Sequence, residues 1–151
     1  MISMNLTCII NIYHGDNPKN FSEAFESVIN QTRKADKILL IVDGPVGEDL
    51  NFTISKYSHI RSLEIHRLKK NLGLNGARKY ALEQCKTELV ALMDSDDVCA
   101  LNRFEKQINI LKTSDIDYVG GQIEEFHENS KIKYKRTVPE KHDEIVKFAK
   151  Y

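Results

Sequence analysis

Apolar and polar residues recur along the chain with two periods, which predict a regular succession of strands and helices. Four apolar or alternating segments predict strands, at residues 6–13, 37–42, 62–67 and 89–93. Four segments with apolar side chains at helical spacing predict helices, at residues 18–30, 46–57, 77–85 and 101–113. Asn17 followed by Pro18 predicts the start of the first of these helices. Strands and helices that alternate in this way predict a parallel, doubly wound α/β sheet with helices on both faces. The unbroken apolar run at 89–93 further predicts a strand buried on both faces.

The pattern changes after Asp115. Residues 117–126 and 131–136 predict two strands joined by a turn at 127–130, and we expect this hairpin to extend the edge of the sheet. Pro139 opens a final helix, which reaches the end of the sequence without a stop signal. No linker divides the 151 residues, so we expect residues 1–151 to form a single domain that is truncated at its C-terminal end.

Three carboxylates within four residues follow the apolar run at 89–93. Side chains alternate in an extended chain, so Asp94 and Asp96 can point to one side while Ser95 and Asp97 point to the other. Two hard oxygen ligands that converge attract Mg²⁺ or Mn²⁺, which completes its shell with water and substrate phosphates. The alternative is that an aspartate here only caps the following helix, and we expect that role for Asp97.

Other polar or aromatic residues also follow predicted strands. They are Tyr13, Asp43 and the segment Asn71 to Gly73. Ligands of open α/β sheets bind beyond the carboxyl ends of the strands, so these residues and Asp94 to Asp96 predict one pocket. There an aromatic ring can stack on a base, an isolated acid can accept its hydrogen bonds, and a metal can neutralise a diphosphate. Two alternatives remain open, core packing for Tyr13 and a local turn before Pro45 for Asp43.

The charges and cysteines narrow the classes of function. The 22 basic and 22 acidic residues cancel, which argues against a nucleic-acid binder driven by bulk charge. Two basic runs, at residues 67–70 and 131–136, are either solvated faces or contacts with phosphates or a membrane surface. Three separated cysteines suit a reducing compartment, and no long apolar segment occurs, so we expect a cytoplasmic protein that could dock on the inner face of a membrane.

Several common catalytic signatures are absent from the sequence. Neither the G-x-G-x-x-G fingerprint nor the P-loop occurs, which disfavours nicotinamide dehydrogenases and P-loop enzymes. No G-x-S-x-G elbow or H-E-x-x-H motif is present. Of the five histidines only His14, near the end of the first predicted strand, is a candidate member of the pocket.

Six segments together resemble family 2 glycosyltransferases, which have the GT-A nucleotide-sugar-binding fold. They are Cys8 to His14, Ser27 to Thr32, Ile41 to Gly44, Asn71 to Gly73, Gly76 to Arg78 and Leu92 to Asp97. Their order and spacing match through about Leu111. A looser similarity at residues 136–145 points to the subset that builds bacterial capsules and exopolysaccharides.

The resemblance implies a role for each matching residue. Asp96 would be the main ligand of Mn²⁺ or Mg²⁺, with Asp94 as the second ligand. The residues that would contact the nucleotide are Asn11, Ile12, Tyr13, Asp43, Asn71, Gly73, Arg78, Asp94 and Ser95. The chain departs from the family pattern in three places. Asn11 and His14 replace a proline and an asparagine, and Lys79 replaces an asparagine.

The implied function is the inverting, metal-dependent transfer of a sugar from a nucleotide-diphospho-sugar, a UDP-sugar, to an acceptor. The acceptor would be a saccharide or lipid-linked saccharide in surface polysaccharide synthesis. Family members continue into an acceptor-binding half that carries the general base. No motif here matches that base, and the consecutive acids Glu124 and Glu125 are poor candidates. We therefore expect a donor-binding fragment with little or no transfer activity.

Two other functions stay open on the sequence alone. One is a phosphatase with an Asp-x-Asp nucleophile, although the pair follows the fourth predicted strand and lacks a following glycine. The other is a non-catalytic nucleotide-binding or assembly module. A fragment of this kind could also form a homodimer through an exposed apolar face.

Overall fold

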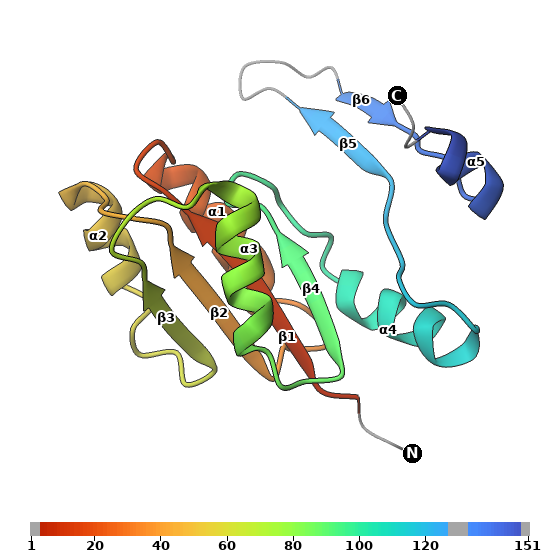
Figure 1. Ribbon diagram of the computed structural model, residues 1–151, viewed down its shortest axis with the longest axis horizontal. Helices are drawn as coiled ribbons and strands as arrows, with labels where there is room; N and C mark the ends of the chain where they lie inside the picture. The colour runs from red at the N-terminus through yellow and green to blue at the C-terminus, as the bar shows by residue number, and fades with distance from the viewer. Residues whose placement is uncertain (1–3, 127–132, 149–151) are drawn as a thin grey trace. The chain divides into compact units, whose positions relative to one another are not determined.

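The computed structural model describes residues 4–126 and 133–148 (Figure 1). The chain forms two compact units, Met1–Thr113 and Ser114–Tyr151, and each is described by itself. No helix in the described ranges is long and apolar enough to cross a membrane.

The first unit is an α/β sheet in which every pair of neighbouring strands is parallel, as predicted. Its strands are β1 (Leu6–Ile12), β2 (Lys37–Val42), β3 (Leu63–Arg67) and β4 (Leu89–Met93). Its helices are α1 (Pro18–Ile29), α2 (Glu48–Ser55), α3 (Gly73–Gln84) and α4 (Arg103–Thr113). The strand order is β3-β2-β1-β4, so the chain changes direction across the sheet between β1 and β4. Such a switch point is where open α/β sheets bind ligands.

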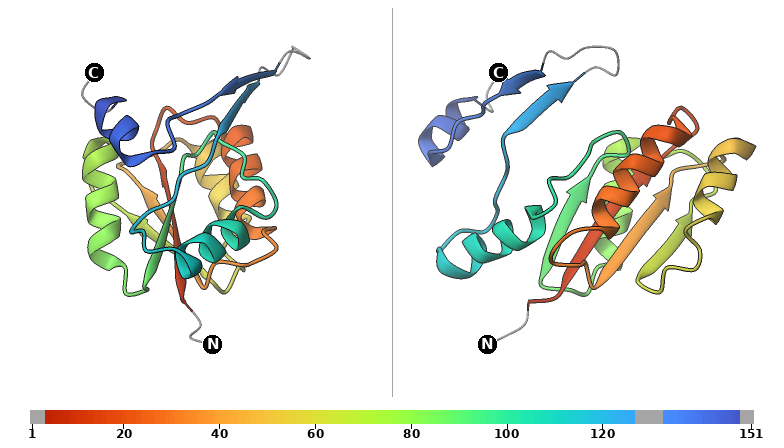
Figure 2. Two further views of the ribbon diagram at one scale, coloured as in Figure 1. Left: turned by 90° about the vertical axis from the view of Figure 1, so that its right-hand side faces the viewer. Right: turned by 180° about the vertical axis from the view of Figure 1, so that it is seen from behind.

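Helices cover both faces of the sheet, which confirms the prediction (Figures 1 and 2). On one face, Ala77 and Ala81 of α3 pack on Ile9, Leu39 and Ile41. The larger core lies on the other face, where α1, α2 and α4 pack against the alternate residues of the strands. The small alanines let α3 approach the strands closely, which brings its N-terminal end near the carboxyl ends of β1 and β2.

The expectation that residues 89–93 are buried on both faces is wrong. Ala91 and Met93 are buried in the larger core, but Val90 and Leu92 on the opposite face are 37% and 41% exposed. β4 is the last strand of the four-stranded sheet, and α3 packs on its inner strands. An apolar run therefore predicted the strand but not the coverage of its second face.

The N-terminal end of α1 is capped by a neighbouring residue in sequence, whereas that of α4 is bound by a residue far away in sequence. Asn17 caps α1 as predicted, because its Oδ1 accepts hydrogen bonds from the N–H groups of Lys19 and Asn20 at 2.8 and 3.3 Å. Asp97 does not cap α4, contrary to expectation. The helix begins later, at Arg103, and its first-turn N–H of Phe104 donates to Gln31 Oε1 at 3.0 Å.

The second unit contains the expected hairpin and final helix. Strands β5 (Ile123–Phe126) and β6 (Lys133–Arg136) pair in antiparallel fashion, and α5 (His142–Phe148) follows. The two strands form a sheet of their own, so the prediction that they extend the main sheet is wrong. The predicted turn at 127–130 and residues 131 and 132 lie outside the described residues.

Candidate functional site

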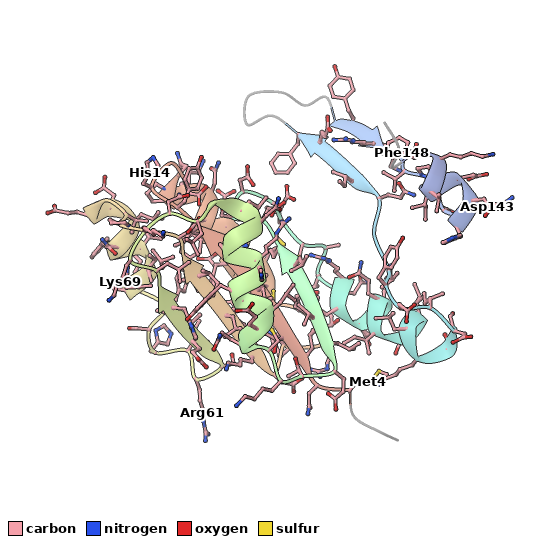
Figure 3. The ribbon with its side chains drawn as sticks, viewed as in Figure 1. Met4, His14, Arg61, Lys69, Asp143 and Phe148 are labelled. Carbon is pink, nitrogen blue, oxygen red and sulfur yellow. The ribbon has the colours of Figure 1, made fainter. Side chains whose placement is uncertain are left out.

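A pocket of about 460 Å³ lies in the first unit, beyond the carboxyl ends of the strands. In Figure 3, His14 and Lys69 mark this end of the sheet, while Met4 and Arg61 mark the opposite end. The pocket brings together every residue predicted to contact the nucleotide or the metal except Arg78, which contacts the pocket residue Asp94. Its lining residues are Asn11, Ile12, Tyr13, Asp16, Asp43, Asn71, Gly73, Leu74, Ala77, Asp94, Ser95 and Asp96. Residues distant in sequence thus meet at the switch point between β1 and β4.

Asp43 fixes one end of the pocket. Its side chain is only 4% exposed, and its Oδ1 accepts a hydrogen bond from the N–H of Leu72 at 2.7 Å. The N–H of Asp43 in turn donates to the carbonyl of Ile12 at 2.7 Å, which ties this acid to the end of β1. Because Asp43 joins a segment far away in sequence, the alternative of a purely local turn before Pro45 does not describe it.

Two glycines permit the close approach of the chain around Asp43. Gly44 has φ +86°, and a Cβ there would lie 2.7 Å from the backbone nitrogen of Asn71. Gly73 has φ +72°, and its N–H donates to Asn71 Oδ1 at 2.9 Å. This end of the pocket therefore has a fixed backbone before any ligand binds.

Tyr13 lies at the pocket with an exposed ring, which rules out the alternative that it is a core residue. It is 44% exposed, and its ring contacts that of His14 edge-on with the centroids 5.2 Å apart. A Cβ on Gly15 would lie 2.6 Å from the Tyr13 hydroxyl oxygen, so a side chain at this position would clash with the ring where it now lies. His14 itself does not line the pocket, contrary to its candidate role.

Carboxylates crowd the opposite end of the pocket. Asp94 Oδ1 accepts a hydrogen bond from Arg78 Nη2 at 2.5 Å, while Ser95 is buried and Asp96 is exposed. Burial raises the pKa of Asp16, and the negative charges of Asp96 and Asp94 add to this effect against hydrogen bonds from Tyr13 and Ser95. Burial followed by the charges of Asp94 and Asp96 likewise raises the pKa of Asp97. The acids thus repel one another in the absence of a cation.

The donor set fits a divalent cation that is shared with a ligand. In the described part of the chain, no group of three or more His, Cys, Asp or Glu side chains is arranged to hold a metal ion. Mg²⁺ and similar ions are commonly held by one or two carboxylates, with water and substrate phosphates completing the shell. Asp94 and Asp96 supply two hard oxygen ligands of this kind at the pocket.

Asn11 gives an independent sign of a ligand. Its Oδ1 is buried and accepts no hydrogen bond, and it is the one such side-chain oxygen or nitrogen found among the described residues. A buried acceptor without a partner is costly, so a ligand or a bound water is needed to satisfy it. Since Asn11 lines the pocket, the residues present fit an occupant with hydrogen-bond donors.

Three lining residues were not predicted from the sequence. They are Asp16, Leu74 and Ala77. Asp16 follows the first strand within a polar turn, so the rule that selected Asp43 could also have selected it. Leu74 and Ala77 lie in the first turns of α3, where apolar residues carry no local sign of a ligand.

Comparisons with known proteins agree with this geometry. Residues 7–150 match the family model described as glycosyl transferase family 2. The amylovoran biosynthesis glycosyltransferase AmsE of Erwinia amylovora is 38% identical over 143 residues, covering 94% of this chain and 53% of that protein. The UDP-Gal:alpha-D-GlcNAc-diphosphoundecaprenol beta-1,3-galactosyltransferase of Escherichia coli is 35% identical over 119 residues, covering 78% and 43% of the two chains. The chain thus spans about half the length of the curated relatives it matches, or less.

Solved structures show the same fold. Residues 1–349 of S. aureus TarS, in complex with UDP, match with a TM-score of 0.63 and 22% identity. The match covers 73% of this chain and 32% of the TarS chain. The parallel sheet with its pocket at the switch point is therefore a GT-A fold, and the chain belongs to glycosyl transferase family 2.

Proposed function

We propose that the chain is the donor-binding part of an inverting glycosyltransferase, which transfers a sugar from a UDP-sugar to a saccharide acceptor in surface polysaccharide synthesis. The observation that carries the proposal is a single pocket with two chemically different ends. Asp43 and the Asn71 segment lie at one end, and Asp94 and Asp96 lie at the other. A nucleoside diphosphate has the matching polarity, with hydrogen-bonding groups on the base and charge on the phosphates.

The nucleoside part of the donor is assigned to the end of the pocket around Asp43. The buried Asp43 and Asn11 Oδ1 supply acceptors for N–H or O–H groups, and the exposed Tyr13 ring can stack on a base. Uracil presents one imide N–H, which suits such acceptors. The relative with UDP-Gal in its name and the TarS complex with UDP support a uridine nucleotide for this chain as well.

The diphosphate is assigned to the end around Asp94 and Asp96. Asp96, which is exposed, would be the principal ligand of Mn²⁺ or Mg²⁺, and Asp94 would be the second. When bound, the cation neutralises charge that develops on the departing diphosphate. Arg78 holds Asp94 in place at 2.5 Å and puts a positive charge beside this end of the pocket.

Transfer itself needs groups beyond those assigned here. Inversion requires a base that deprotonates the acceptor hydroxyl, which then attacks the anomeric carbon in line with the leaving diphosphate. Glu124 and Glu125 lie in the second unit and are not assigned this role. We therefore expect this chain to bind the donor without efficient transfer. A lipid-linked acceptor, as named for the E. coli relative, would place the reaction at the cytoplasmic face of a membrane.

Calorimetric titration with UDP, in the presence and absence of Mn²⁺, tests the proposal. We expect UDP to bind in both conditions and more tightly with Mn²⁺. Asp96→Ala should abolish most of the gain in UDP affinity from Mn²⁺, because the carboxylate proposed as the main ligand of the ion is removed. We expect the affinity with Mn²⁺ to fall about tenfold or more. Asp115→Ala, which removes an exposed acid from the second unit, is the matched control and should behave as the parent chain.

Two results would contradict the proposal. Absence of UDP binding in both conditions would remove the nucleotide assignment. Unchanged Mn²⁺ dependence in Asp96→Ala would remove the metal assignment. Release of phosphate from a simple phosphomonoester would instead favour the phosphatase alternative.

A further inference from the structure

The segment that carries the acids has no regular secondary structure of its own. Residues 94–102 connect the end of β4 to the start of α4, and they contain turns but no helix or strand. We call residues 94–102 the acidic loop. Asp94 is held by Arg78, whereas no protein group in the described ranges donates a hydrogen bond to the Asp96 carboxylate. The position of Asp96 therefore depends on the backbone of the acidic loop.

The side chain of Gln31 is hydrogen-bonded to the acidic loop. It follows the C-terminal end of α1 and is only 1% exposed. Its Nε2 donates to the carbonyl of Ala100 at 2.7 Å and to the carbonyl of Ser27 at 3.1 Å. Its Oε1 accepts from the N–H of Phe104 at 3.0 Å. One buried carboxamide thus joins α1, the acidic loop and the first turn of α4.

Two neighbours of Gln31 add contacts to the same loop. Ser27 Oγ accepts a hydrogen bond from the N–H of Cys99 at 3.0 Å. The backbone N–H of Thr32 donates to the carbonyl of Leu101 at 2.9 Å. Three consecutive residues of the acidic loop, 99 to 101, are therefore each bound by the segment 27–32, far away in sequence.

The chemistry of these contacts distinguishes them from ordinary helix packing. A buried amide group costs free energy unless its donors and acceptors are paired, and an apolar side chain would fill the same space without that requirement. Gln31 directs its polar atoms to backbone groups of the acidic loop and of α4, so it fixes their positions as well as filling space. The loop needs this support because it has no ladder or helix to order it.

We propose that Gln31 is a positioning residue for the metal end of the pocket. It fixes residues 99–101 and so sets the path of the acidic loop that carries the Asp96 carboxylate. The inference rests on the proposed function for its ligand, but the ordering of the loop can be measured without any ligand. The hydrogen bonds found for Gln31 among the described residues go to Ser27, Ala100 and Phe104 and not to the residues around Asp43, so its loss should spare the other end of the pocket.

The first experiment measures loop order in the absence of ligand. Gln31→Met keeps the length of the side chain without burying a charge, and it removes all three hydrogen bonds. Amide hydrogen exchange at Cys99, which lies in the acidic loop, should become at least about tenfold faster in this variant, while exchange in β1 and β2 stays slow. Unchanged exchange in the acidic loop would overturn the proposal whether or not the chain binds UDP.

The second experiment measures UDP affinity with and without Mn²⁺ in the same variant. We expect the affinity without Mn²⁺ to change less than twofold and the affinity with Mn²⁺ to fall about tenfold, since roughly one well-placed ligand contact is lost. An equal loss in both conditions would show a general structural role and contradict the proposal. If the parent chain binds UDP with no gain from Mn²⁺, the metal part of the proposed function fails, and the exchange experiment alone decides the role of Gln31.

Two further variants separate the effect on the acidic loop from a general loss of stability. Ser27→Ala removes the acceptor of the Cys99 N–H while keeping a good helix former. It should therefore speed exchange at Cys99 at least as much as Gln31→Met does, and it should lower the Mn²⁺-dependent affinity in the same direction but by less. Thr53→Val changes a buried polar residue in α2, whose Oγ1 donates within its own helix at 2.9 Å. This control should alter stability without altering the exchange of the acidic loop or the Mn²⁺ dependence. If Gln31→Met does not fold, an Mn²⁺ dependence in Ser27→Ala equal to that of the parent chain overturns the proposal.

Discussion

Asp16 shows how single carboxylates at the pocket respond to one another. It was not predicted as a site residue, yet it lines the pocket and accepts a hydrogen bond from the Tyr13 N–H at 2.8 Å. Burial and the charges of Asp96 and Asp94 raise its pKa above the usual 3.8. The ionised form of Asp16 therefore destabilises the folded chain at neutral pH, and a cation at this end of the pocket would relieve the repulsion.

We predict that Asp16→Asn raises the stability of the free chain at pH 7. The amide oxygen still accepts from Tyr13, but the negative charge on this partly buried side chain is gone. Because the folded pKa of Asp16 is raised, its protonation stabilises the fold as the pH falls, so the advantage of the variant shrinks through the folded pKa and vanishes below 3.8. Urea unfolding at several pH values between 7 and 4 measures this difference. A constant difference across that range would contradict the assignment, and the exposed Asp115→Asn provides a control.

Secondary-structure elements meet at the pocket through the turn after β2. Gly44 follows Asp43 there and lies against the segment that leads into α3. Its positive φ and its approach to Asn71 leave no space for a side chain. Gly47, at the start of α2, is a matched contrast, since a Cβ there would meet nothing within 4 Å.

We predict that Gly44→Ala lowers the free energy of unfolding by about 1–3 kcal/mol, because a Cβ forces both a strained φ and a backbone clash. Gly47→Ala should lower it by less, about 0.5–1 kcal/mol, because Gly47 is the N-cap of α2 and alanine is a poorer cap. Gly44→Ala should also weaken UDP binding without Mn²⁺, since Asp43 and Asn71 move apart. Denaturant unfolding and calorimetry measure the two effects, and equal stabilities of the two variants would refute the argument.

At the scale of the whole molecule, the two units differ in how far their described apolar residues are buried. Both clusters of buried apolar residues, and every residue that lines the pocket, belong to the unit Met1–Thr113. In the second unit, large apolar residues such as Tyr118, Phe126 and Phe148 are 52–68% exposed. The first unit therefore holds both buried apolar clusters and the whole pocket lining found among the described residues.

We predict that residues 1–113 alone fold cooperatively and bind UDP with Mn²⁺ within about threefold of the affinity of the full chain, since the pocket and both cores are retained. Circular dichroism, urea unfolding and calorimetry on the two chains make the comparison. Residues 114–151 as a separate peptide serve as the control and should show no cooperative transition. Loss of folding or of UDP binding in residues 1–113 would contradict this division.

Much of the fold and of the pocket could be predicted because it depends on local chemistry. The periods of apolar residues identified each helix and strand of the first unit, and the Asn17–Pro18 pair marked the start of α1. Parallel strands present their carboxyl ends at one edge, so the positions of Tyr13, Asp43 and Asp94 in the sequence were enough to place them at one pocket.

Contacts between distant residues were decided only by the tertiary structure. An unbroken apolar run places apolar side chains on both faces of a strand and does not indicate which face is covered. The exposure of Val90 and Leu92 therefore depended on where α3 packs. Nothing in the local sequence of α4 indicates that Gln31, 73 positions away from Phe104, binds its first turn. The sequence by itself thus determined the elements, their order and the acids at their ends. The folded chain decided which side chains bury, pair and hold those acids, because these depend on packing between segments that no local period encodes.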